Sequence, residues 1–75
     1  MKRTCTEVFY ITSHAGTRNN KYDDPWEAVK YLRSMPKHKQ QMFGVTCVET
    51  YTYYNEDGSL HHRESYENWI NEEDY

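Results

Sequence analysis

The sequence predicts an α+β domain of the order β-α-β-β, in which one helix packs on a small, three-stranded, mostly antiparallel sheet. Three observations lead to this prediction. Residues 4–13 and 45–54 are runs of β-branched and aromatic residues, which suit strands. Residues 24–35 combine a helix start signal with apolar residues at helical spacing. Residues 57–58 are Asp-Gly, a preferred dipeptide of tight hairpins, which would join the last two strands.

Residues 4–13, TCTEVFYITS, form the first predicted strand. Phe9 and Ile11 share one face with Cys5, because alternate residues of a strand point the same way. Neither face is wholly polar, so we expect this strand to lie inside the sheet or to be covered on one side. Residues 14–23 contain a glycine and an Asn-Asn pair and are predicted to form a loop, whose length leaves room for a short extra strand.

The helix start is the clearest local signal. Asp24 suits the N-cap, Pro25 falls at the first helical position, and Glu27 completes an Asp-x-x-Glu capping box. Pro36 should end the helix near residues 34–35. The helix and the strands together predict a core of Phe9, Ile11, Ala28, Val29, Leu32, Met35, Val45 and Cys47, with Trp26 and Phe43 closing its ends.

After the helix, residues 37–41 are a polar connection to the second strand, which is predicted at 45–54. The returning strand of the hairpin, at 60–66, is polar in composition and is therefore expected at an edge of the sheet. Residues 67–75 form an acidic tail, in which Trp69 and Ile70 would tie the chain to the body.

The length and composition bound the size, the compartment and the partners. With 75 residues the chain is predicted to be a single domain over 1–75, ordered at about 4–70. Its hydrophobic fraction of 36% includes eight tyrosines, so a homodimer that buries more apolar surface remains open. No apolar run is long enough for a signal peptide or a membrane helix, which predicts a cytoplasmic protein without a membrane partner. In that compartment Cys5 and Cys47 are expected to be reduced and buried.

The net charge of −3 hides an asymmetry along the chain. Residues 1–42 hold eight Lys/Arg and four Asp/Glu, a net charge of +4. Residues 43–75 hold one Arg and eight Asp/Glu, a net charge of −7. These halves could neutralise each other in the fold, or the acidic half could attract a basic partner.

Catalysis, cofactors and metals find little support. The sequence holds no Gly-x-Ser-x-Gly, phosphate-cradling glycine loop or His-Glu-x-x-His, and two strand cysteines expected to be buried are poor nucleophiles. His61 and His62 are adjacent, so on a strand their side chains point to opposite faces and cannot bind one metal ion together. His62 and Glu64 share a face and supply only two ligands. A closed zinc site needs four ligands. We therefore predict a protein that is not an enzyme and has neither cofactor nor metal.

Two binding surfaces remain as hypotheses. The leading one is a protein-binding surface of carboxylates and tyrosines on the hairpin, which would contact a basic surface of a protein or protein complex. Its residues are Glu49, Tyr51, Tyr53, Tyr54, Glu56, Asp57, Glu64 and Tyr66. The alternative is a nucleic-acid-binding patch at the helix C-terminus, made of Lys30, Arg33, Lys37 and Lys39. The carboxylates on the neighbouring strands would repel phosphate, which favours the first hypothesis.

The sequence leaves open which face of residues 45–54 is buried. If Glu49 faces solvent, Tyr51 and Tyr53 are exposed with it, because residues two apart share a face. If Val45 and Cys47 face inward instead, that face is core, and Tyr54 points outward with its threonine neighbours. The apolar character of Val45 and Cys47 favours the second arrangement.

Residues 24–58 show a resemblance to a class of known proteins. A capped helix, DDPWEAVKYLRSM, is followed by a polar turn, Phe43-Gly44, a strand VTCVET and a Tyr-Asn-Glu-Asp-Gly hairpin. This outline is similar to that of small phage and mobile-element inhibitors, including anti-CRISPR proteins and phage inhibitors of host RNA polymerase. The resemblance implies a compact sheet with one helix that blocks a host nucleic-acid-handling complex stoichiometrically. It is architectural and assigns no functional residue.

Overall fold

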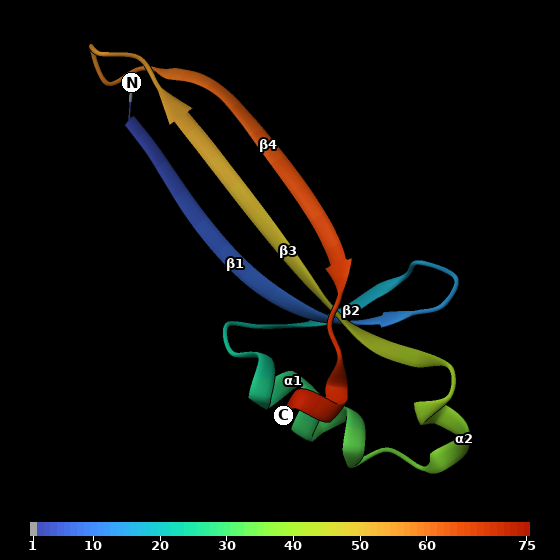
Figure 1. Cartoon of the computed structure of the whole chain (residues 1–75). Coiled ribbons are helices and arrows are strands. Elements are labelled where there is room, and N and C mark those ends of the chain that lie inside the picture. Colours follow the sequence, from blue (N-terminus) through green and yellow to red (C-terminus); the bar gives the residue numbers. More distant parts are fainter. Residues whose placement is uncertain (1) are drawn as a thin grey trace.

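The computed structural model describes residues 2–75 and contains a four-stranded antiparallel sheet with a helix on one face (Figure 1). The strand order is β2-β1-β3-β4. The elements are β1 (Lys2–Ser13), β2 (Arg18–Tyr22), α1 (Pro25–Arg33), α2 (Lys37–Gln40), β3 (Phe43–Tyr54), β4 (Leu60–Trp69) and a 3₁₀ turn η1 (Glu72–Asp74). The predicted α+β class is confirmed, and every strand pair is antiparallel.

The prediction of three strands was wrong, because the expected loop contains the fourth strand, β2. Its sequence, RNNKY, has no strand pattern of its own, and its backbone is held by pairing with Phe9–Thr12 of β1. The returning hairpin strand β4 also extends past the predicted end at 66 to Trp69. Its expected position at the edge of the sheet is confirmed.

The helix α1 begins and ends as predicted. Asp24 is the N-cap, and its carboxylate accepts a hydrogen bond of 2.9 Å from the amide of Trp26. Leu32 is buried, and seven of the eight predicted core residues form the core cluster, whereas Met35 is only partly buried against it. Trp26 does not close the core as predicted, since half of it is exposed. The polar connection after α1 contains the short helix α2.

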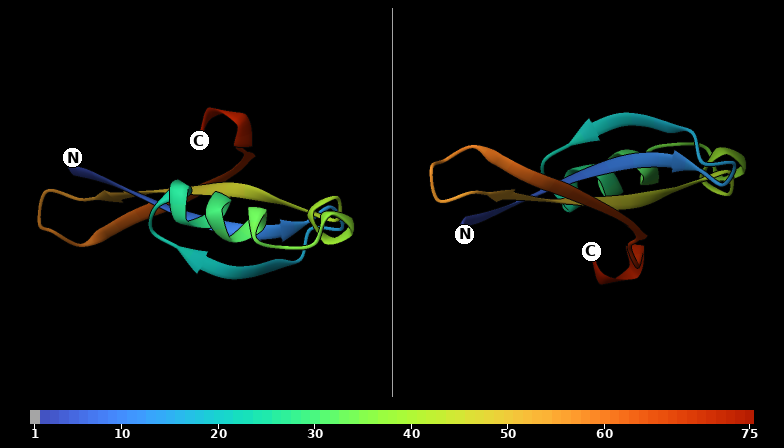
Figure 2. Two further views of the ribbon diagram at one scale, coloured as in Figure 1. Left: turned by 90° about the horizontal axis from the view of Figure 1, so that it is seen from below. Right: turned by 90° about the horizontal axis from the view of Figure 1, so that it is seen from above.

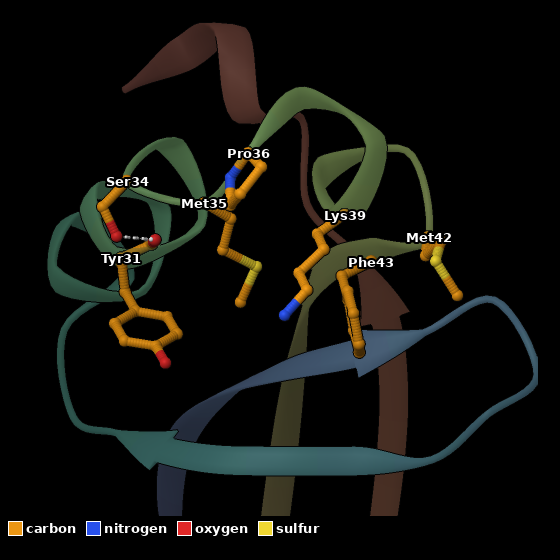
Figure 3. Close-up of a pocket in the computed structure, with 7 residues that line it drawn as sticks. All are labelled: Tyr31, Ser34, Met35, Pro36, Lys39, Met42 and Phe43. Carbon is orange, nitrogen blue, oxygen red and sulfur yellow. Dashed lines mark hydrogen bonds between the residues drawn. The ribbon is translucent and has the colours of Figure 1, made fainter.

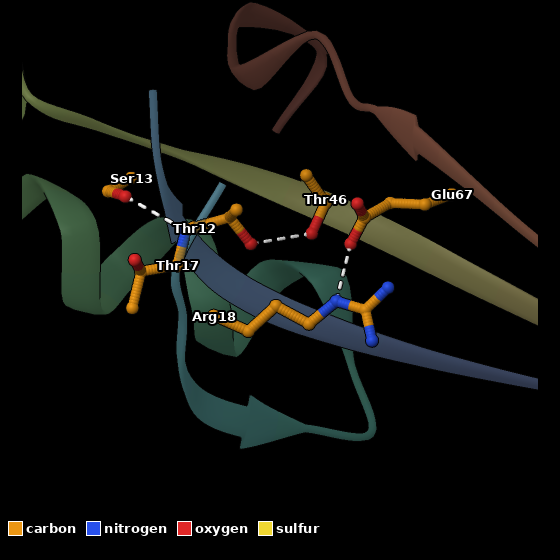
Figure 4. A network of polar contacts seen from close by, with 6 residues as sticks. All are labelled: Thr12, Ser13, Thr17, Arg18, Thr46 and Glu67. Atoms are coloured by element: carbon orange, nitrogen blue, oxygen red, sulfur yellow. Dashed lines mark hydrogen bonds and ion pairs between the residues drawn. The ribbon is translucent and has the colours of Figure 1, made fainter. Parts of the chain in front are cut away.

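Polar contacts join the strands on the face of the sheet opposite α1 (Figure 4). The hydroxyls of Thr12 and Thr46, both buried, hydrogen-bond each other at 2.7 Å across β1 and β3. Arg18 on β2 forms an ion pair of 2.7 Å with Glu67 on β4. Because β2 and β4 are the two outer strands, this pair reaches across both inner strands and ties the sheet together at its covered end.

The C-terminal residues follow β4 back to the helix end of the molecule (Figure 1). The amide of Ile70 donates to the carbonyl of Val45, and the Ile70 side chain packs on the core, in agreement with its predicted role as a tie. Trp69 remains half exposed. Within residues 2–75 no helix has the length and apolar character needed to cross a membrane.

The two cysteines differ in exposure. Cys47 is buried in the core cluster, whereas Cys5 is exposed, and their sulfurs are not bonded to each other. The expectation that Cys5 is buried was therefore wrong. Cys5 does lie on a strand and on the same face as the core, but the helix does not reach that part of β1.

Candidate functional site

The helix covers only one end of the face on which it lies (Figure 2). A nine-residue helix is about 13 Å long, whereas twelve-residue strands reach about 40 Å. The sheet therefore projects past α1, and the molecule measures 51 Å along its longest axis. The uncovered part of this face is called the distal face below; it consists of Arg3, Cys5, Glu7, Glu49, Tyr51, Tyr53, His62, Glu64 and Tyr66.

The two arrangements that the sequence left open for β3 both hold in part. Val45 and Cys47 face the helix and are buried, as the favoured arrangement required. Glu49, Tyr51 and Tyr53 share that face but lie beyond the helix, where they are half-buried between neighbouring strands. The same face of one strand is thus core at one end and accessible surface at the other.

Hydrogen bonds hold the tyrosines of the distal face to its carboxylates. Tyr51 donates its hydroxyl proton to Glu49 at 2.7 Å, and Tyr66 donates to Glu64 at 3.2 Å. The carboxylate beside each hydroxyl disfavours phenolate, which raises the pKa of Tyr51 to about 12 and raises that of Tyr66 as well. Both hydroxyls therefore remain donors at neutral pH.

Ring contacts fix the aromatic side chains further. The rings of Tyr51 and Tyr66 meet edge to face at 6.1 Å between centroids, and those of Tyr53 and His62 stack at 4.3 Å. The guanidinium of Arg3 lies 5.5 Å from the centroid of Tyr51. These geometries are the favourable ones for aromatic pairs and for a cation over a ring. The distal face is therefore an ordered array of rings and carboxylates.

A second group of acidic atoms lies where the distal face meets the core. Glu7 and Glu49 are directly opposite each other on β1 and β3, and the Cys47 thiol donates to Glu7 at 3.5 Å. Burial, followed by the hydrogen bond to Glu7, raises the pKa of Cys47 to about 11. At neutral pH the thiol is thus protonated, which makes it a poor nucleophile and a poor metal ligand.

The ligand-type atoms of Glu7, Cys47 and Glu49 lie within 4.8 Å of one another. They number three, fewer than the four ligands of a closed zinc site. The sequence hypotheses about metals considered only His61, His62 and Glu64 and missed this group. Glu7 and Cys47 are 40 residues apart, and only the pairing of Phe9 with Cys47 brings their side chains together.

Three predicted protein-binding residues lie outside the distal face. Tyr54 belongs to the opposite face of β3, and Glu56 and Asp57 lie in the hairpin turn. Asp57 accepts from the amide and the hydroxyl of Ser59, at 2.9 and 2.6 Å, and these bonds lower its pKa. The carboxylate of Asp57 therefore stabilises the turn. The other five predicted residues lie together on the distal face.

The predicted nucleic-acid patch is divided between two helices. Lys30 and Arg33 lie on α1, and Lys37 and Lys39 lie on α2. Arg33 donates to the backbone carbonyls of Glu72 and Tyr75, at 3.0 and 2.6 Å. These bonds place the acidic turn η1, which carries three carboxylates, beside the basic patch. The electrostatic attraction of this patch for phosphate is correspondingly reduced.

A pocket of about 520 Å³ lies between α1 and α2 (Figure 3). It is lined by Tyr31, Ser34, Met35, Pro36, Lys39, Met42 and Phe43. Sequence reasoning missed it, although two methionines, a proline and an aromatic residue at the end of a helix are a recognisable apolar group. It is open to solvent and carries a single charged side chain, that of Lys39.

No family model, curated protein or solved structure matches the chain.

Proposed function

We propose that this protein is a non-catalytic binding protein whose distal face contacts a basic surface on another protein. The observation that carries the proposal is the array of tyrosines and carboxylates on a part of the sheet that no helix of residues 2–75 covers. Tyrosine rings supply contact area at small conformational cost, and the hydrogen bonds to Glu49 and Glu64 reduce that cost further by fixing the rings before binding.

Charge supports a basic partner. The distal face carries three carboxylates, those of Glu7, Glu49 and Glu64, and one guanidinium, that of Arg3. An acidic surface accelerates encounter with a basic one and discriminates against acidic surfaces. Nucleic-acid-binding proteins present basic surfaces, so a host nucleic-acid-handling complex is a chemically suitable target. Together with the resemblance to small phage inhibitors, this favours an inhibitor that covers such a surface in the cytoplasm.

Direct nucleic-acid binding through Lys30, Arg33, Lys37 and Lys39 is the second candidate function. The position of the acidic turn η1 beside Arg33 argues against it. The two candidates predict opposite responses to the same substitutions, and one set of variants distinguishes them.

The test compares two double variants that make the same chemical changes at different places. Tyr53→Ala/Glu64→Gln removes a ring and a charge from the distal face, whereas Tyr54→Ala/Glu56→Gln removes them from the opposite face and the turn. Immobilised wild-type and variant proteins are incubated with nuclease-treated bacterial lysate, and retained proteins are quantified by mass spectrometry. We expect the distal variant alone to lose proteins that the wild type retains, and the salt dependence of retention to flatten.

Equal retention by the wild type and the distal variant would contradict the proposal. Equal losses in both variants would assign binding to the hairpin as a whole. For the nucleic-acid candidate, fluorescence anisotropy with a single-stranded oligonucleotide is measured for the wild type and for Lys30→Gln/Lys37→Gln/Lys39→Gln. Binding that this triple variant loses, and that the distal variant keeps, would replace the first proposal with the second.

A further inference from the structure

The outer edge of β1 is open over its first half. Strand β2 pairs only with Phe9–Thr12, so in the described chain Lys2–Val8 pair on one side only, with β3. Figure 1 shows this part of β1 running away from β2 toward the hairpin. Side chains 2–7 are exposed, and the pairing with β3 continues through 2–8 without a bulge. Such an edge is a ready template for another strand.

The sequence of this edge is complementary to itself. We consider two identical antiparallel strands related by a two-fold axis perpendicular to the sheet. Directly opposite residues of such a pair point to the same face, and side chains alternate between faces along a strand. The two-fold axis must therefore pass through a residue and its symmetry copy, and not between two residues. Centred on Cys5, the segment KRTCTEV places Arg3 of each copy opposite Glu7 of the other. Centres at Thr4 or Thr6 would leave Arg3 and Glu7 without opposite charges facing them and would use fewer residues.

We propose that two copies of the chain form a two-fold dimer by antiparallel pairing of their β1 edges, centred on Cys5. Each interface then contains two Arg3–Glu7 pairs, two Thr4–Thr6 pairs and one Cys5–Cys5 pair. Strands β1, β3 and β4 of each copy join those of the other in one continuous sheet, and the distal faces of the two copies lie on the same side of it. This proposal is independent of the partner of the distal face.

The charges within one copy support this arrangement. Glu7 lies directly opposite Glu49, and like charges in that position repel each other. Arg3 of the same copy lies four positions from Glu7 along β1, and its guanidinium lies over the ring of Tyr51 on β3. In the dimer the partner's Arg3 comes directly beside Glu7 and offsets the repulsion.

The outer edge of β4 is less suited to self-pairing. It carries Glu64 and Glu67 against a single Arg63, and its pairing with β3 is irregular near the turn. A pair of β4 strands centred on Ser65 would place Arg63 of each copy opposite Glu67 of the other, but within one copy Glu67 already forms an ion pair with Arg18 and Arg63 already donates to Thr52. The β1 edge has room for the partner strand, because β2 ends opposite Phe9 and leaves the edge open from there to Lys2. Asp23 and Asp24 follow β2, and the Lys2 side chain of the second copy would lie next to them.

Sedimentation velocity on the full chain over a concentration series tests the proposal through the charges. The wild type should dimerise weakly, since edge pairing buries little surface. Arg3→Glu alone or Glu7→Arg alone should weaken the dimer about ten-fold or more, because each places like charges face to face twice. An equimolar mixture of these two variants should form a heterodimer, and the doubly reversed variant Arg3→Glu/Glu7→Arg should dimerise like the wild type.

Lys21→Glu and Glu56→Arg make the same changes in charge at exposed positions outside the edge and should leave the dimer unchanged. Circular dichroism verifies that every variant is folded. A wild type that stays monomeric at the highest concentration would overturn the proposal. So would a dimer that both single reversals leave intact, or a mixture that fails to restore it.

The thiol of Cys5 provides a second readout. Opposite residues of antiparallel strands have Cα atoms about 4.5–5.5 Å apart, within the range of a disulfide. Diamide should therefore oxidise two Cys5 thiols to one intermolecular disulfide, taking up their two electrons and two protons. We expect this covalent dimer in the wild type, much less of it in Arg3→Glu, and none in Cys5→Ser. A reversible dimer that diamide does not cross-link through Cys5 would place the interface elsewhere.

Discussion

The covered end and the distal end of the sheet are built from the same strands and differ in almost every other respect. At the covered end, Ile11, Val29 and Val45 are fully buried between α1 and the sheet. At the distal end, the same face carries tyrosines and carboxylates that hydrogen-bond each other and remain accessible. The difference arises because the strands are about three times as long as the helix.

This difference separates the residues that stabilise the fold from those of the proposed binding surface along one axis of the molecule. Apolar burial, which drives folding, is concentrated where the helix lies. The distal end adds little burial and is held by strand pairing and by polar contacts between neighbouring strands. Side chains there can change with small effects on folding, which is the condition under which a binding surface can be altered without loss of the fold.

The two cysteines give the largest expected contrast between the ends. In dilute, monomeric protein at pH 8, iodoacetamide should label exposed Cys5 at least about a hundred-fold faster than Cys47. Cys47 is buried, and with a pKa of about 11 only a small fraction of it is thiolate at that pH. Peptide mass spectrometry over time measures both rates, with urea-unfolded protein as the control. Equal rates in folded protein would show that the helix end opens readily.

The pKa of Cys47 also implies a dependence of stability on pH. The pKa is raised from 9.0 in its ordinary state to about 11 in the folded protein, so folding favours the protonated thiol. Its contribution to stability is complete below pH 9 and is lost as the pH rises toward 11. Comparison with Cys47→Ala, which cannot titrate, isolates this contribution in urea unfolding at several pH values.

A core substitution should affect folding far more than a distal one. Leu32→Ala is expected to lower the free energy of unfolding by about 2–5 kcal/mol, because Leu32 is buried under α1. Tyr53→Ala removes a stacking contact with His62 and should cost about 1 kcal/mol or less. Urea unfolding followed by circular dichroism measures both, and Leu32→Met serves as a volume-conserving control. Similar costs for the two alanine variants would contradict the division between the ends.

The buried hydroxyl pair tests whether the face opposite α1 also belongs to the stable end. Thr12→Val leaves the hydroxyl of Thr46 buried without its partner and should cost about 1–3 kcal/mol. The double variant Thr12→Val/Thr46→Val removes both hydroxyls at nearly constant shape and should recover most of that loss. A double-mutant cycle in urea gives the coupling between them. Additive losses would mean that the two hydroxyls do not depend on each other.

The stable end was largely predictable from the sequence, because its signals are local. The N-cap at Asp24, the proline that follows it and the spacing of Ala28 and Leu32 fixed the helix and its buried face. Strand β2 was not predictable in the same way. Its residues are polar, and only pairing with β1 makes them a strand.

The distal face was predictable in composition but not in extent. Five of its residues were named from the sequence, yet β3 was treated as having one face wholly buried or wholly exposed. That choice assumed a helix that covers the entire sheet. The same assumption led to the wrong expectation that Cys5 is buried. The approach of Glu7 to Glu49 required the strand register, which depends on the whole fold.

The hairpin turn, at the far tip of the distal end, should show the smallest and most local effect. Its loop is closed by Gly58, whose φ of 89° suits glycine, and by Asp57, which accepts two hydrogen bonds from Ser59. These bonds lower the pKa of Asp57 below its ordinary value of 3.8. The folded turn therefore favours the ionised carboxylate of Asp57. The contribution of this carboxylate to stability is complete above pH 3.8 and is lost as the pH falls through the lower pKa of the folded protein.

Hydrogen exchange and NMR shifts of the Gly58 and Ser59 amides between pH 5 and about pH 2 should follow this loss, while the amides of Ile11 and Val45 respond later. Asp57→Asn keeps an acceptor but cannot titrate, so it should remove the early change and leave the turn formed. If wild type and Asp57→Asn respond to acid alike, Asp57 does not hold the turn.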